Sequence, residues 1–131
     1  MEYNLHMSTN FYAELEIGQN VTYKLHIGKR SSNGISTFNG KHFPSVAAWE
    51  EFLRFNEPIV KIVDEYGTEH NLEKFIEDEF YVPGSSDRQI QWLRENLSDF
   101  VGIADEPQKN PRASKHWIDK DGYLFYKGEF S

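Results

Sequence analysis

Apolar and polar residues alternate along residues 11–17 and again along residues 21–27. A period of two is typical of β-strands that turn one face to the core and the other to solvent. The segment 18–20 between them is short and polar and begins with glycine. The pattern therefore predicts an antiparallel hairpin whose turn lies at residues 18–20.

Charged residues on the polar face predict the register of this hairpin. If Ile17 pairs with Val21, then Glu14 lies directly opposite Lys24. A cross-strand pair of opposite charge contributes roughly 0.2–1 kcal/mol to a hairpin. The ion pair therefore favours this register, which places Ile17 and Val21 on the apolar face.

Three later segments have apolar residues at the three- and four-residue spacing of a helix. The first begins after the N-cap residue Ser45 and ends before Pro58, and the second has Asn71 as its N-cap. The third runs from about Asp87 to Val101. The apolar stripes of the three helices are Val46, Trp49, Phe52 and Leu53; Leu72, Phe75, Ile76 and Phe80; and Ile90, Leu93, Leu97 and Phe100.

Further strands are predicted between and after these helices. Residues 35–38 form a short strand, and the apolar run 59–63 is expected to be central in the sheet because both of its faces are apolar. Residues 117–118 and 123–126 flank a turn sequence that ends in glycine, and they predict a second hairpin.

Together these elements predict an α+β fold, a small antiparallel-rich sheet with about three helices packed on one face. The 131 residues are enough for one domain spanning residues 1–131. Within it, residues 1–8 are expected to be flexible. Residues 102–115 are polar and contain two prolines, so they are expected to form a mobile loop.

Composition restricts the classes of function. Aromatic residues make up 15% of the chain, which argues against disorder. The absence of cysteine excludes disulfides, thiol catalysis and a thiolate metal site, and the five histidines lack metal-ligand spacing, so no metal or cofactor is expected. No apolar run could span a membrane and no signal segment opens the sequence, so the protein is expected to be soluble and cytoplasmic.

Charge is distributed unevenly along the chain. The net charge is −7, and residues 57–79 account for −6 of it, whereas residues 18–46 contain four basic residues and no acidic one. This uneven distribution of charge has two interpretations. The charged segments form an ordinary solvated surface, or they form a protein-binding face whose charge steers the approach of a partner. Nucleic acid is not expected as a partner, because the overall charge has the wrong sign. Mimicry of DNA by carboxylates is a weaker hypothesis, since two lysines interrupt the acidic segment.

The segment Gly28–Gly34 is the first candidate for chemistry. Its residues Lys29, Arg30, Ser31 and Ser32 resemble part of a nucleotide-binding P-loop, but the first glycine of that motif is missing and a strand, not a helix, is predicted to follow. Two interpretations stay open. The segment is either a looser anion-binding loop or a turn whose serines bond their own backbone. The first predicts that Lys29 and Arg30 are exposed and functional rather than structural.

Asp64 and Glu65 could be read as a pair of catalytic carboxylates. Adjacent side chains on an extended chain point apart, so a strand-ending turn with Asp64 bonded to the backbone and Gly67 at positive φ is favoured. No motif of an activated nucleophile is present. His26 lies on the polar face of its strand and is expected to face solvent. The sequence therefore leans away from an enzyme.

Trp92 is the second candidate residue, because it falls nearly opposite the apolar stripe of the third helix. It is either covered by residues 102–115 or by the C-terminal hairpin, or it is exposed and anchors a partner protein.

The chain contains four short motifs, each once and in this order: Thr9-Asn10-Phe11-Tyr12, His26-Ile27-Gly28-Lys29-Arg30-Ser31-Ser32, Asp64-Glu65-Tyr66-Gly67 and the final Gly128-Glu129-Phe130-Ser131. In this order they resemble a family of small proteins, mostly from bacteriophages, that has no assigned function. The relatives also carry a C-x-x-C metal knuckle, which this cysteine-free chain lacks, so no metal role is carried over. A shared terminal motif implies that the C-terminus is docked, with Phe130 buried.

The resemblance implies an accessory protein that acts by binding another protein in the cytoplasm of a bacterial host. Inhibition of a host enzyme or of a defence complex such as a CRISPR nuclease is a common role of such proteins. The alternative is a small-molecule or nucleotide-binding protein, or an enzyme, that uses the Gly28–Gly34 segment.

Overall fold

The structure is a computed structural model in which residues 8–31, 36–104 and 115–128 are described. The elements in chain order are β1 (Thr9–Gly18), β2 (Val21–Arg30), β3 (Ser36–Asn39), α1 (Val46–Phe55), β4 (Val60–Asp64), β5 (Glu69–His70), α2 (Leu72–Glu79), α3 (Asp87–Asn96), β6 (Phe100–Ile103), β7 (His116–Ile118) and β8 (Leu124–Tyr126). No described helix is long and apolar enough to cross a membrane.

The strands form one sheet in the order β5-β4-β1-β2-β3-β8-β7-β6. Five neighbouring pairs are antiparallel, and two pairs, β3 with β8 and β6 with β7, are parallel. The predicted α+β class is therefore confirmed, as is the second hairpin, β7–β8. The prediction that the apolar run 59–63 is central is wrong, because β4 lies next to the two-residue edge strand β5.

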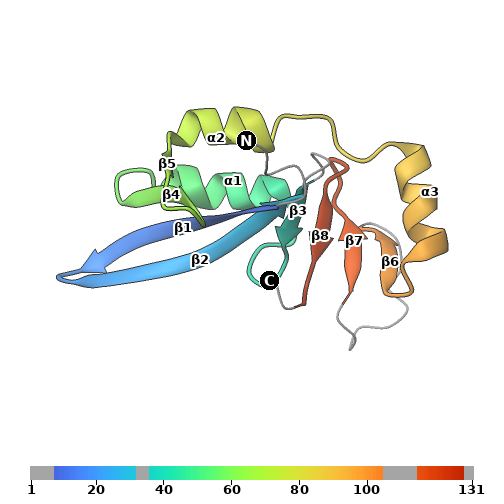
Figure 1. Ribbon diagram of the computed structural model, residues 1–131, viewed down its shortest axis with the longest axis horizontal. Helices are drawn as coiled ribbons and strands as arrows, with labels where there is room; N and C mark the ends of the chain where they lie inside the picture. Colours follow the sequence, from blue (N-terminus) through green and yellow to red (C-terminus); the bar gives the residue numbers. More distant parts are fainter. Residues whose placement is uncertain (1–7, 32–35, 105–114, 129–131) are drawn as a thin grey trace.

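The β1–β2 hairpin has the predicted pairing of Glu14 with Lys24, and the two charged groups are 3.9 Å apart. At the turn, however, Gly18 and not Ile17 lies opposite Val21, because the register shifts after Glu16. The hairpin extends well beyond the two helices α1 and α2 (Figure 1). Ile17 and Val21 are therefore at least half exposed, which corrects their expected burial.

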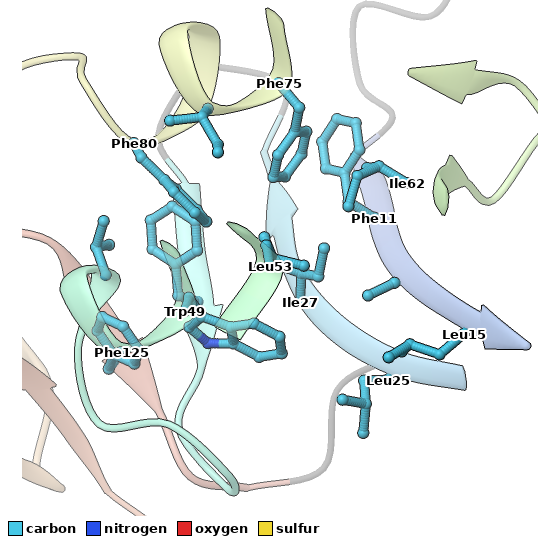
Figure 2. Close-up of a cluster of buried hydrophobic side chains, with 14 of the residues drawn as sticks. Phe11, Leu15, Leu25, Ile27, Trp49, Leu53, Ile62, Phe75, Phe80 and Phe125 are labelled. Carbon is cyan, nitrogen blue, oxygen red and sulfur yellow. The ribbon is translucent and has the colours of Figure 1, made fainter. Parts of the chain in front are cut away.

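The main core lies between the sheet and the helices α1 and α2 (Figure 2). Trp49 and Leu53 of α1 are fully buried, and Phe75 of α2 packs edge-on against Phe11 of β1 with ring centroids 5.2 Å apart. Phe125 of β8 is also fully buried. The predicted N-caps of these helices are confirmed, since Ser45 and Asn71 accept backbone N–H bonds from the first turns.

Helix α3 lies at the end of the molecule away from the hairpin turn (Figure 1). In β8, Phe125 belongs to the main core, so the neighbouring Leu124 points to the opposite face of the sheet. Leu124 lines a groove with Leu93, the buried residue of α3. The prediction that all three helices pack on one face is therefore wrong, because α3 is on the other face.

Helix α3 also ends earlier than predicted. Its last residue is Asn96, and Phe100 and Val101 belong to the strand β6. The helical spacing of Leu93, Leu97 and Phe100 continued across this boundary by coincidence. Of the predicted mobile loop, residues 102–103 lie in β6 and residues 105–114 lie outside the described part of the chain.

Candidate functional site

The predicted loop at Gly28–Gly34 is wrong for its first three residues, which continue β2. Gly28 pairs with Phe38, Lys29 with Thr37, and Arg30 with Ser36 of β3. A Cβ atom at Gly28 would lie 2.7 Å from the carbonyl oxygen of Thr37, so glycine is needed for the close approach of β3. The strand leaves no cradle for a phosphate at these residues. Ser32 lies outside the described residues.

Arg30 points to the helix-covered face of the sheet and forms an ion pair with Glu79 of α2. The side chain of Glu79 is only 5% exposed, while that of Arg30 is 42% exposed. The hydroxyl of Ser36 donates a hydrogen bond of 3.2 Å to the same carboxylate. Arg30 therefore neutralises a buried charge, and the expectation that it is functional rather than structural is corrected.

Alternation in β2 turns the neighbour Lys29 to the opposite face, the one on which α3 lies. Ser31 lines the groove beneath α3, together with Trp92. Two of the predicted binding residues, 61 positions apart in the sequence, are thus brought to one site.

We call this site the α3 groove. It has a volume of about 380 Å³. Trp92 is 56% exposed, so the C-terminal hairpin β7–β8 leaves it largely uncovered, and residues 105–114, the other segment expected to cover it, lie outside the described part of the chain. The α3 groove is lined by Ser31, Ser85, Gln89, Trp92, Leu93, Leu97 and Leu124.

A polar cleft of about 210 Å³, which we call the Glu79 cleft, adjoins the α3 groove. The two cavities share Ser85, Gln89 and Leu124 as lining residues. Glu79 and Ser36 also line the cleft, whereas Arg30 does not. Glu79, whose side chain is 5% exposed, is therefore the charged residue of this cleft.

Two close contacts fix the walls of the Glu79 cleft. Gly84, in the link between α2 and α3, packs on Gly122, and a Cβ atom at Gly84 would lie 2.5 Å from the Gly122 backbone. The hydroxyl of Tyr123 donates to the carbonyl oxygens of Phe80 and Val82. Burial raises the pKa of Tyr123, and the nearby carboxylates of Asp119 and Asp121 raise it further.

A second polar cluster lies on β1 and β2 beside the turn after β4. The backbone and side-chain amides of Asn10 donate to Glu65 Oε1 at 2.7 and 3.0 Å. Because the Asn10 amide nitrogen is used in this way, its Oδ1 faces His26 Nε2, 2.8 Å away, and the imidazole is the donor. His26 is half-buried and stacks on Tyr12, so the expectation that it faces solvent is wrong.

This cluster joins residues from three of the short motifs. Asn10, His26 and Glu65 each come from a different motif, and they form one hydrogen-bonded unit. Burial lowers the pKa of His26, and Lys29 and Lys24 lower it further, while the Gly28 carbonyl and Glu65 act in the opposite direction.

The predicted turn after β4 is confirmed. The Asp64 carboxylate accepts hydrogen bonds from the backbone of Tyr66 and Thr68 at 2.9 and 3.0 Å. Gly67 has a φ of +86°. Asp64 also contacts His70 Nε2 at 3.0 Å, so its carboxylate is occupied by structural contacts. Among the described residues, no three His, Asp or Glu side chains gather as metal ligands.

The sequence interpretation missed Glu79, which enters it only as one of the acidic residues of segment 57–79. A signal was available, since Glu79 lies three and four positions after the apolar residues Ile76 and Phe75. An acid on the apolar stripe of a helix requires a buried partner. The partner itself, Arg30, could not be deduced from the pattern.

Comparison with protein-family models, with curated proteins and with solved structures finds no match for this chain. The resemblance to small phage-encoded proteins therefore stays a prediction.

Proposed function

We propose that this protein acts by binding another protein, and that the α3 groove is its docking site. The observation that carries the proposal is Trp92, whose side chain is 56% exposed at the edge of an otherwise largely apolar cavity. Tryptophan is enriched among the residues that dominate the binding energy of protein interfaces. An exposed tryptophan beside an apolar depression is therefore a suitable anchor for a partner.

The composition of the α3 groove supports a protein partner. Leu93, Leu97 and Leu124 provide apolar walls, and the polar residues Ser31, Ser85 and Gln89 complete the lining. An apolar centre with a polar rim is the usual anatomy of a protein interface. The resemblance to phage accessory proteins adds the class of partner that we propose, a host enzyme or a defence complex.

Binding of a small molecule is the second candidate function. The volume of the α3 groove, about 380 Å³, is at the low end of the range of roughly 300–1,000 Å³ for small-molecule pockets. A nucleotide is less suitable, because Gly28, Lys29 and Arg30 form a strand and provide no phosphate cradle.

The proposal is tested with Trp92→Ser. A partner is isolated from host-cell extract on the immobilised wild-type protein, identified, purified, and titrated by calorimetry. We expect Trp92→Ser to raise the dissociation constant about 30-fold. This corresponds to a loss of about 2 kcal/mol of binding free energy, the size of effect that defines a hot-spot residue. Phe55→Ser is the matched control, because Phe55 is 83% exposed on α1, on the other face of the sheet. Equal affinity of both variants and the wild type would contradict the proposal.

A further inference from the structure

The α3 groove continues into the Glu79 cleft, and the two parts differ in chemistry. One is walled by leucines and Trp92, and the other contains a carboxylate. We propose that the bound segment of the partner places a bulky apolar side chain in the α3 groove and a cationic side chain, lysine or arginine, in the Glu79 cleft. This inference rests on the proposed function and specifies the partner's chemistry.

Glu79 has capacity for another donor. A carboxylate has about four acceptor positions. The described contacts use three of them: Oε1 accepts from Ser36 and from Arg30 Nε at 3.4 Å, and Oε2 contacts Arg30 Nη2. Glu79 lines the cleft and Arg30 does not, so the proposed cation takes the remaining position of Oε2.

The surroundings of the Glu79 cleft favour positive charge over a neutral donor. Asp119 and Asp121 act on Tyr123, which lines the same cleft, and both contribute to its raised pKa. Among the described residues that line the cleft, Glu79 is the acidic one and none is basic. A cation that replaces its hydration by a charge-assisted hydrogen bond to Glu79 complements this field.

A single extended segment can reach both parts, since they share Ser85, Gln89 and Leu124. In an extended peptide, side chains on the same side are two residues apart, a separation of roughly 7 Å. The segment is therefore expected to contain an apolar residue and a lysine or arginine two positions away. A lone metal cation or free amine would use only the carboxylate and would not depend on Trp92.

The probe is a displayed library of random peptides, selected on the full-length protein. We expect the selected peptides to share an apolar residue and a basic residue at this spacing. A synthetic copy of the best peptide is then compared with a copy in which glutamine replaces the basic residue, by fluorescence anisotropy. The replacement is expected to weaken binding to the wild-type protein at least about tenfold, as for the loss of a charge-assisted hydrogen bond.

Variants of the protein assign the contact to Glu79. In Glu79→Gln the two peptides should bind with nearly equal affinity, whereas in the control Glu77→Gln, an exposed position on the same helix, the tenfold difference should persist. If Glu79→Gln does not fold, Ser36→Ala serves as the second variant, and a changed preference for the basic peptide is expected, because this substitution opens a further acceptor position on Glu79.

The outcomes separate the two proposals. Peptides that need Trp92 but are indifferent to the basic residue would overturn the cationic inference and leave the docking site intact. Peptides that bind equally to Trp92→Ser would overturn the docking site itself. A selection that enriches no common pattern would count against both.

Discussion

The two faces of the sheet differ in how their side chains are covered. On the face that carries α1 and α2, Trp49, Leu53 and Phe125 are fully buried in one continuous cluster. On the face that carries α3, Leu93 is the buried residue of that helix, and the tryptophan next to it is more than half exposed. We infer that the first face provides most of the stability and that the second is available for recognition.

Neighbouring residues of one strand show the same division. Lys29 and Arg30 were treated as a unit from the sequence, yet strand alternation sends them to opposite faces. Arg30 satisfies the buried Glu79, while Lys29 lies on the side of the α3 groove. Two adjacent basic residues in a strand can therefore have different roles, one in stability and one on the face available for recognition.

The largest expected effect is on the covered face. Trp49→Ala should lower the free energy of unfolding by about 3–5 kcal/mol, because it removes a fully buried ring and leaves a cavity. It also removes the indole donor to the Asn39 carbonyl. Denaturant unfolding measures the change. Phe55→Ala, on the same helix but 83% exposed, is the control and should stay within about 0.5 kcal/mol. Similar losses in both variants would contradict the comparison of faces.

The second largest effect concerns Arg30 and Lys29, the two neighbouring residues of β2 that point to opposite faces of the sheet. Arg30→Ala leaves the carboxylate of Glu79 buried with Ser36 as its remaining partner among the described residues, so we expect a loss of about 3 kcal/mol. This is the low end for a broken buried pair, since the arginine itself is partly exposed. Lys29→Ala is the matched control and should change the free energy of unfolding by less than about 0.5 kcal/mol. Equal stability of the two variants would show that the pair is not structural.

Local features of the fold could be predicted from the sequence, because they depend on neighbouring residues. The hairpin pairing of Glu14 with Lys24, the caps Ser45 and Asn71, and the turn at Gly67 follow from alternation and turn chemistry. The face chosen by α3 could not be predicted. That choice depends on which side of β8 Leu124 faces, and β8 pairs with β3 across more than 80 residues of sequence.

The site was only partly predictable for the same reason. Ser31 and Trp92 were named as separate candidates, and nothing in the pattern indicated that they share a groove. The partners of Asn10, His26 and Glu65 lie 16 and 55 positions apart. Hydrogen bonds between residues so far apart in the sequence leave no periodic pattern in it. The contact between these residues could therefore not be predicted from the sequence.

A smaller effect is expected from the pH dependence of His26. Its folded-state pKa lies below the ordinary value of 6.5, so the folded protein binds the proton less readily than the unfolded chain. The stability that depends on neutral His26 is therefore present above pH 6.5 and is lost as the pH falls below it, at about 1.4 kcal/mol for each unit by which the pKa is lowered.

The difference in unfolding free energy between wild type and His26→Gln, measured between pH 5 and 7.5, isolates this contribution from that of the other titrating groups. The difference should shrink as the pH falls. A difference that is constant over this range would show that His26 titrates as it does in the unfolded chain.

The smallest effect on stability is expected at Trp92, on the face available for recognition. Trp92→Phe should change the free energy of unfolding by less than about 0.5 kcal/mol, since the ring lies largely outside the packed core.

The difference between the wild-type and Trp92→Phe emission spectra isolates this indole from the buried Trp49 and Trp117. That difference spectrum should be red-shifted and quenched by iodide in the free protein. On addition of the partner it should shift to the blue and become protected. A signal that is already blue and protected in the free protein would mean that the α3 groove is covered, and the two faces would then differ in architecture but not in availability.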